Sequence, residues 1–362
     1  MIRTLIPDIG DVPVASWDAL TAQAGLYLSH QWLAAQQRDP TAQVRYALVH
    51  DDGHLVAAAP LYVVDTEPNA LYRVPEILPD RTPARTLLAG ARRGYVNAPL
   101  LHPRLTPDRR REALSRLVAA AESLAAAQEA QPWWLYVTDA AASELADACG
   151  TKPVRLGQDA RIPLPGSTFD DYLAARPSKR RVTIRRERRA FAEAGYELRT
   201  LRLSECADAA GALLAQLQER HGHAADPAVM ARLLRDQAEG MADSGIVCAA
   251  FAEGRMVAFS LFYRHAGTVW LRATGYDYAR LRGAHEYFNL VYYLPIEDAY
   301  AHGATGLHLG MESLRAKTLR GATTSPLWAI EGGGKTVGAP ARGWSKFSGV
   351  PDGGPGGAVI GC

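Results

Sequence analysis

The chain has 362 residues, of which 48% are hydrophobic, and a formal net charge of +2. Two domains are expected at this length, because one domain usually holds roughly 100–200 residues. The nearly balanced charge excludes a general polyanion binder, so any affinity for nucleic acid must come from a local cluster of cations. The first residues lack the layout of a signal peptide, and no run of about 20 apolar residues occurs. We therefore expect a cytoplasmic protein without a membrane span.

Helical and strand patterns alternate along the chain. In the first half they predict helical material at 16–37, a hairpin at 46–62, a loop-rich stretch at 67–103, a helix at 107–128, a strand at 133–137 and a helix at 140–149. In the second half they predict a helix at 178–195, helical material at 207–241, a hairpin at 247–263, a strand at 268–275, a helix at 285–302 and a short strand at 307–310. This alternation predicts an α/β or α+β fold with a mixed sheet.

The two predicted hairpins resemble each other. Each has an apolar strand, an acidic residue followed by glycine, and a second apolar strand; the turns are Asp52-Gly53 and Glu253-Gly254. Glycine supplies the positive φ that such a turn requires. Because helical material precedes each hairpin and a further strand follows, the pattern favours an internal duplication.

The predicted helix at 178–195 is strongly basic. Seven of the eleven residues from 179 to 189 are cationic, namely Lys179, Arg180, Arg181, Arg185, Arg186, Arg188 and Arg189. Ile184 and Phe191 share one face, and beside it a ridge is predicted from Arg181, Arg185, Arg188 and Arg189. A solvated helix face is one interpretation. The density and single sign of the charge favour the other, a phosphate-rich ligand such as tRNA, a nucleotide or coenzyme A.

Two stretches resemble the second GNAT-like domain of FemAB-like proteins. One is residues 169–195, where Phe169-Asp-Asp-Tyr172-Leu173 precedes the basic helix. The other is residues 287–321, similar to the closing helix, the strand and the glycine–acid–lysine–arginine–glycine loop of that family. The resemblance extends over about residues 12–330. It implies an α/β fold of two tandem GNAT-like domains, at 1–165 and 166–330, followed by a glycine-rich tail at 331–362.

The resemblance also implies an acyltransferase that forms an amide bond. The expected donor is aminoacyl-tRNA and the acceptor an amine of a small molecule or peptide-like compound, with no cofactor besides the donor substrate. Acyl-CoA is the alternative donor, and a non-catalytic RNA- or precursor-binding module is a further alternative. Typical coenzyme-A-binding GNATs carry R/Q-x-x-G-x-G/A, whose backbone amides bind pyrophosphate. Residues 280–285 here read Arg-Leu-Arg-Gly-Ala-His, and His285 replaces the last small residue, which favours aminoacyl-tRNA.

The family pattern places the acyl-transfer site in the loop after the strand at 307–310. Glu312 would accept or position the amine proton, and Lys317 and Arg320 would hold an anionic or carbonyl group. An exposed, salt-bridged loop is the alternative. Further candidates are His285 as a base or phosphate ligand, and the substrate-binding residues Arg315, Asp277, Tyr287 and Tyr292. Core packing is the alternative role of the tyrosines.

No metal site is expected. The four cysteines lie far apart without CxxC spacing and are interpreted as reduced thiols: Cys149, Cys206, Cys248 and Cys362. The histidines and acids at Glu219, His221, His223 and Asp226 match no known ligand spacing and are interpreted as a solvated loop.

Overall fold

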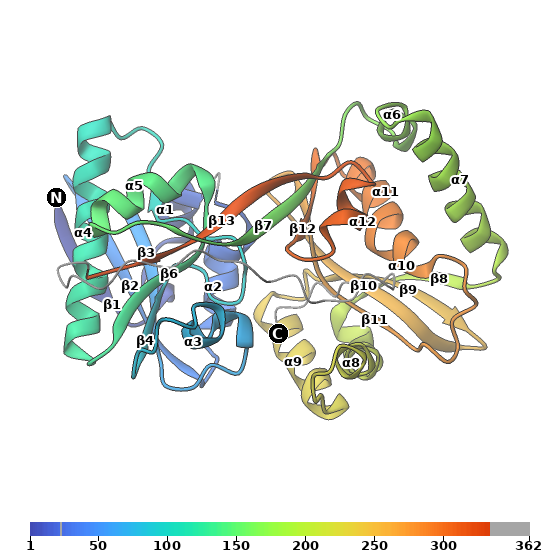
Figure 1. Ribbon diagram of the computed structural model, residues 1–362, viewed down its shortest axis with the longest axis horizontal. Helices are drawn as coiled ribbons and strands as arrows, with labels where there is room; N and C mark the ends of the chain where they lie inside the picture. The colour runs from blue at the N-terminus through green and yellow to red at the C-terminus, as the bar shows by residue number, and fades with distance from the viewer. Residues whose placement is uncertain (22–23, 334–362) are drawn as a thin grey trace.

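The computed structural model describes residues 1–21 and 24–333. The molecule is elongated, and its two halves lie side by side, bridged by two long strands (Figure 1). Within the described ranges, no helix combines the length and the apolar content that crossing a membrane requires. Most of the predicted glycine-rich tail, residues 334–362, lies outside the described residues.

The first half contains the predicted helices and hairpin together with several strands that the sequence patterns did not predict. Its elements are β1 (Ile2–Ile6), η1 (Ile9–Asp11), α1 (Val14–Thr21), η2 (Leu26–Leu28), α2 (His30–Gln36), β2 (Ala42–Asp51), β3 (His54–Val64), η3 (Ala70–Tyr72), α3 (Val74–Ile77), β4 (Thr86–Ala89), β5 (Leu100–Leu101), α4 (Pro107–Ala127), β6 (Gln131–Thr138), α5 (Asp139–Cys149) and β7 (Val154–Pro163).

The second half begins with two helices and then follows the same plan. Its elements are α6 (Phe169–Ala174), α7 (Ser178–Glu193), β8 (Glu197–Arg202), α8 (Leu203–Arg220), α9 (Pro227–Gly240), β9 (Ile246–Ala252), β10 (Arg255–His265), β11 (Thr268–Tyr276), α10 (Glu286–Phe288), the π-helix η4 (Asn289–Tyr293), α11 (Leu294–Ala301), β12 (Gly306–Gly310), α12 (Leu314–Thr318) and β13 (Thr323–Glu331).

Both predicted hairpins are present, as β2–β3 and β9–β10. Their turns have positive φ at both central residues: 46° at Asp52 and 80° at Gly53, and 52° at Glu253 and 75° at Gly254. This is the type I′ geometry, whose twist matches that of the flanking strands. After each hairpin come an antiparallel strand, a helical segment, a strand parallel to the previous one, a helix and a final strand.

The final strands β7 and β13 are exchanged between the halves. β7 pairs antiparallel with β12 of the second half, and β13 pairs antiparallel with β6 of the first half. The two also pair with each other. The result is one 13-stranded sheet in the order β1-β2-β3-β4-β6-β13-β7-β12-β11-β10-β9-β8, with β5 beside β3. The boundary placed after residue 165 follows the end of β7, so it divides the chain without dividing the sheet.

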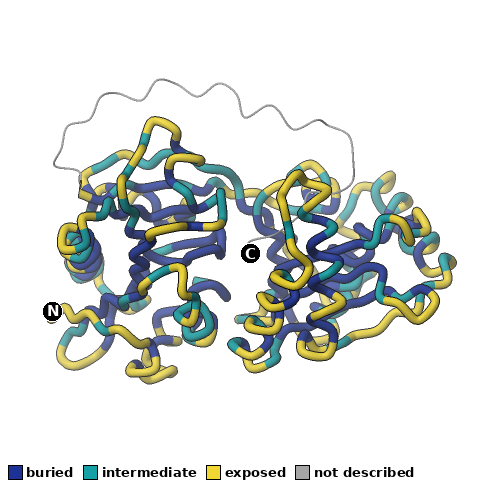
Figure 2. The backbone as a smooth tube through the Cα atoms, turned by 90° about the horizontal axis from the view of Figure 1, so that it is seen from below, coloured by how far each residue is buried: buried dark blue, intermediate teal, exposed yellow. Residues whose placement is uncertain are grey.

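The core forms three layers around this sheet. One layer is continuous across the halves and packs α1 and α2 together with α8 and α9. On the opposite face, α4 and α5 cover the first half, and α7, η4 and α11 cover the second. Figure 2 shows the buried strands inside both halves and the exposed residues on the outer loops and helices. At Gly240 a Cβ would lie only 2.7 Å from Ala35 Cβ, so glycine lets α9 approach α2 closely across the junction.

Candidate functional site

The sheet opens between two parallel strands of the second half. β11 and β12 pair only from Thr268 to Trp270 and from Gly306 to His308. Beyond these pairs, β11 continues along β10 to Tyr276, while the end of β12 pairs with β7. Ligands of open α/β sheets commonly bind at the carboxyl ends of parallel strands where neighbours diverge. This opening is therefore the candidate site.

The corresponding opening of the first half is closed by a side chain. There, β4 and β6 pair in parallel up to Ala89 and Trp134. Asn97, only 1% exposed, fills the space beyond: its Nδ2 donates to Ala89 O at 2.8 Å and to Leu135 O at 3.1 Å. Its Oδ1 accepts from Ala91 N–H at 3.1 Å. These bonds satisfy the diverging backbone internally, so the first half has no comparable opening here.

The turn from β12 to α12 borders the opening and has an unusual backbone. Gly310, Glu312 and Ser313 have φ values of 67°, 59° and 44°. Positive φ at a non-glycine residue costs about 1–3 kcal/mol and persists only where the surroundings enforce it. Lys317 supplies such enforcement, since its buried Nζ donates to Leu309 O at 2.7 Å, to Gly310 O at 3.0 Å and to Met311 O.

Glu312 is reachable by solvent and yet partly desolvated. Its side chain is exposed. Desolvation by the surrounding protein nevertheless raises the pKa of its carboxyl, against the lowering effect of Lys317 and of His223 on the α8–α9 loop. Burial is the largest cause of the raised pKa of Tyr136 on β6. The neighbouring Tyr72 and Tyr95 contribute next, and the charge of Glu312 makes a smaller contribution. Glu312 thus lies within electrostatic reach of groups from both halves. A carboxylate that a substrate can reach and whose pKa is raised is suited to act as a general base.

Two buried titratable side chains, His308 and Asp159, lie behind this turn, and the exposed Arg161 contacts Asp159. His308 Nε2 on β12 is 2.7 Å from Asp159 Oδ1 on β7, and Arg161 Nε donates to Asp159 Oδ2 at 3.1 Å. Burial acts to raise the pKa of Asp159, but His308 and Arg161 outweigh it and hold that pKa at about 2. Burial lowers the pKa of Lys317 to about 7, while Asp159 and Glu312 oppose the shift. Sequence reasoning missed Asp159, His308 and Arg161.

The predicted tyrosines pack against each other in the core, and Tyr287 lies beside the β12–α12 turn. Tyr287 OH lies 3.4 Å from Tyr292 OH, and both rings are buried. Burial raises the pKa of Tyr287, and hydrogen bonds with Tyr292 and with the Ser313 side chain lower it. Tyr292 belongs to the π-helix η4, a feature often found at functional sites. The prediction that these residues contact substrate stays a prediction; their positions combine core packing with proximity to Ser313.

The loop before α10 is closed by an internal carboxylate. Glu286 Oε1 accepts from Arg282 N–H at 3.0 Å, from Ala284 N–H at 3.1 Å and from Tyr196 OH at 2.7 Å. Glu286 is only 4% exposed, and these donors outweigh its burial and lower its pKa. The preceding residue, His285, has φ 61° and its side chain does not cap the helix. Sequence reasoning singled out this loop but not Glu286.

The basic helix α7, at the outer edge of the second half in Figure 1, does not form one ridge. Arg181 turns inward and its Nη1 donates to Arg176 O at 2.7 Å. Arg188 pairs with Glu297 and lies 4.0 Å above the Phe169 ring. The side chains that face solvent are Lys179, Arg185, Arg186 and Arg189, and Arg180 is half-buried. The arginines beside Ile184 and Phe191 therefore divide into a structural pair and a solvent-facing group.

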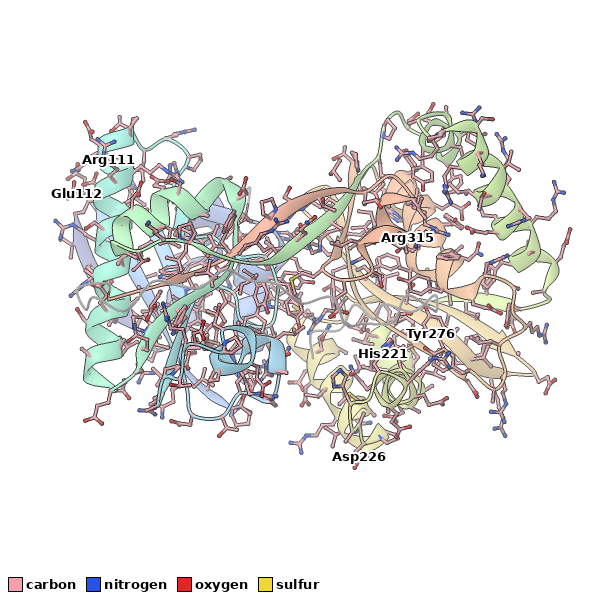
Figure 3. The ribbon with its side chains drawn as sticks, in the orientation of Figure 1. Arg111, Glu112, His221, Asp226, Tyr276 and Arg315 are labelled. Carbon is pink, nitrogen blue, oxygen red and sulfur yellow. The ribbon has the colours of Figure 1, made fainter. Side chains whose placement is uncertain are left out.

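Arg320 has an internal role in this conformation. Its Nη2 donates to both carboxylate oxygens of Glu187, at 3.0 and 2.9 Å, and its Nε donates to Tyr293 OH at 3.1 Å. All three residues lie away from solvent, so the pair ties the segment after α12 to α7 and η4. The predicted substrate contact of Arg320 stays a prediction. Arg315, labelled in Figure 3, is exposed on α12.

Local contacts hold the predicted substrate-binding residue Asp277, and the loop that was predicted to be solvated is exposed. Asp277 follows β11 and accepts from Ala279 N–H at 3.2 Å, and its Oδ2 pairs with Arg280 at 2.6 Å. His221 and Asp226 flank the exposed α8–α9 loop, in the lower part of the second half in Figure 3. Asp226 caps α9. Among the described residues, no three His, Cys, Asp or Glu side chains are arranged to hold a metal ion.

The family model FemAB-like, described as peptidoglycan biosynthesis/recognition, matches residues 98–331. The chain belongs to the FemAB-like family. The match includes the exchanged strands, the basic helix and the β12–α12 turn. Membership confirms the resemblance and the expectation of a transferase enzyme. No curated protein matches the chain.

Solved structures share the whole architecture at low sequence identity. FemX superimposes with a TM-score of 0.64 and 12% identity, covering 91% of this chain and 97% of FemX. A tandem GNAT protein from the clavulanic acid biosynthesis pathway has a TM-score of 0.54 and 16% sequence identity, covering 91% of this chain and 98% of that protein. L-PGS from Bacillus licheniformis superimposes with a TM-score of 0.55 and 14% sequence identity, covering 91% of this chain and 94% of L-PGS. These likenesses establish the fold and confirm the predicted pair of GNAT-like domains around a mixed sheet.

Proposed function

We propose that this FemAB-like protein transfers an aminoacyl group from aminoacyl-tRNA to an amine of a small-molecule or peptide-like acceptor. The observation that carries the choice of donor is the position of Glu286. Its carboxylate occupies the backbone amides of Arg282 and Ala284, in the loop where coenzyme-A-binding GNATs hold pyrophosphate. A second anion at the same amides would lie against a buried negative charge.

The solvent-facing group of α7 supports an RNA contact. Arg185, Arg186 and Arg189 are exposed, and within the described part of the chain no carboxylate pairs with them. Exposed arginines that are not neutralised by neighbours suit the phosphates of a nucleic acid backbone. A donor whose carrier binds α7 while its acyl group lies at the β11–β12 opening must be large, and aminoacyl-tRNA is much larger than acyl-CoA.

Amide formation at the opening needs a proton acceptor. The acceptor nitrogen attacks the ester carbonyl carbon, a carbon–nitrogen bond forms, and the carbon–oxygen bond to the terminal ribose of the tRNA breaks. Glu312 takes the proton that the nitrogen loses and passes it to the ribose oxygen as that oxygen leaves. The hydroxyl group of Tyr287 is close to Glu312 and is a candidate to stabilise the oxyanion.

The proposal is tested by product analysis with both classes of donor. The protein is incubated with a panel of amines and either a pool of charged tRNAs or a panel of acyl-CoAs, and amides are detected by mass spectrometry. We expect an amide that forms only with charged tRNA and is lost when the tRNA is first digested with ribonuclease. An amide that still forms after ribonuclease treatment and requires acyl-CoA would refute aminoacyl-tRNA as the donor.

A matched binding measurement addresses the same point without turnover. By calorimetry, the wild-type protein should not bind 3′,5′-ADP or pyrophosphate, which are fragments of coenzyme A. Tight binding of either by the wild type would contradict the role given to Glu286. Salt-sensitive tRNA binding without a product from any donor would instead favour a non-catalytic binding module.

A further inference from the structure

Lys317 has no hydrogen-bond donor to spare for a substrate. A lysine ammonium carries three N–H donors. In this structure Nζ contacts three acceptors, the main-chain oxygens of Leu309, Gly310 and Met311, and the side chain is fully buried. The acceptors belong to the protein, so the ammonium serves the backbone of the turn.

These three oxygens converge because β12 ends irregularly. Successive carbonyls of a regular strand point in alternating directions. The pairing of β12 with β7 shifts register between His308 and Gly310, and Gly310 has φ 67°. Three neighbouring carbonyl dipoles then point at one place, which is unfavourable unless a donor or a positive charge lies there. Lys317 provides both.

The residues that follow this convergence are Glu312 and Ser313, the two non-glycine residues of the turn with positive φ. We propose that Lys317 is a positioning residue: it holds the β12–α12 turn in its left-handed backbone and so presents Glu312 at the opening, without binding donor or acceptor itself. The inference rests on the proposed function only in taking Glu312 as the proton acceptor.

The first test replaces Lys317 with methionine, which has a similar length and no donors. We expect kcat to fall about a hundredfold, because small displacements of a reacting group have effects of that order, with little change in KM. Amide hydrogen exchange at residues 310–313, measured without substrate, should speed up at least about tenfold. Unchanged exchange at these amides would overturn the proposal, whatever happens to activity.

A second-site change separates positioning from direct chemistry. In the Lys317→Met background, Ser313→Gly should recover about tenfold in kcat, because glycine adopts positive φ without the cost of about 1–2 kcal/mol that other residues incur. Ser313→Ala in the same background removes the hydroxyl without easing the backbone and should recover nothing. Equal behaviour of the two double variants would refute the role.

Two further variants keep the test decisive. If Lys317→Met does not fold, Lys317→Arg retains a charge and donors with a different geometry, and it should fold, exchange faster at Glu312 and Ser313, and lose kcat. Unchanged exchange in Lys317→Arg would contradict the proposal. Glu312→Gln should lose activity while its turn exchanges as in the wild type. Full activity of Glu312→Gln would show that Glu312 is not the proton acceptor. The hydrogen-exchange measurements would still test whether Lys317 holds the turn.

Discussion

The divided arginines of α7 give a quantitative prediction about RNA binding. The solvent-facing group consists of Lys179, Arg185, Arg186 and Arg189, whereas Arg188 is engaged with Glu297 and Phe169. The perturbation is the triple replacement of Arg185, Arg186 and Arg189 by glutamine. It removes three charges that contact solvent and leaves the buried face of the helix unchanged.

Counterion release sets the magnitude. Each phosphate that a cation neutralises contributes about 0.7–0.9 to the slope of log affinity against log salt, so four contacts predict a slope of about −3 to −4. Between 50 and 200 mM salt, the affinity for tRNA should then fall about a hundredfold. The triple variant should lose about 2–3 units of slope, because one of the four cations remains.

Fluorescence anisotropy of a labelled tRNA, titrated at several salt concentrations, measures this slope. The matched control is Arg188→Gln, on the same helix, whose side chain is half-buried and engaged with Glu297 and Phe169; it should lower stability and leave the slope unchanged. If the triple variant keeps the wild-type slope, or if Arg188→Gln loses as much slope as the triple variant, then α7 is not the RNA contact.

Three other predictions concern the Arg320–Glu187 pair, the titration of Glu312 and Lys317, and the buried Asn97. Arg320→Met leaves Glu187 buried without its partner, so urea denaturation should show a free energy of unfolding lower by about 3–5 kcal/mol, partly recovered by adding Glu187→Gln. Because Glu312 must be ionised to act as a base, kcat/KM should rise as the pH passes through its raised pKa. It should fall again as the pH passes about 7, the pKa of Lys317, because the ammonium that holds the turn is lost. Lys317→Arg, which stays charged, should remove this fall at alkaline pH. Asn97→Ala should cost about 2–4 kcal/mol of stability and leave kcat unchanged, and a selective loss of kcat would contradict the closed first half.

Local chemistry explains what could be predicted from the sequence. The Asp52-Gly53 and Glu253-Gly254 turns encode their hairpins within a few residues, so the duplicated plan was visible. The resemblance to FemAB-like proteins identified the fold, and it pointed to Glu312 and Lys317, which do lie together at one turn.

The exchanged strands could not be predicted in the same way. β7 carries Gln158, Asp159 and Arg161 among its apolar residues, so it has no clear alternation. Both of its neighbours, β12 and β13, come from the far end of the chain. β4 was missed because four residues within a loop-rich stretch give no periodicity to detect.

Long-range partners also hid part of the site. A histidine within the apolar strand at 307–310 was a signal that His308 needs a buried partner, but nothing local names Asp159. Glu286 gave a clearer signal, since acids at the start of a helix stabilise its free amides. The division of the α7 arginines depended on Glu297 and Arg176, which helix periodicity alone does not place.

Asn97, rather than the reciprocal exchange of β7 and β13, explains why the opening of the second half is the candidate site and that of the first half is not. The Asn97 side chain closes the first half internally, and Tyr136 on β6 lies within electrostatic reach of Glu312 in the second half. In the second half, β7 from the other half brings Asp159 behind Lys317. Glu312 therefore depends on both halves for its electrostatic surroundings. Because each half contributes the last strand of the other's sheet, separating them would remove these groups together.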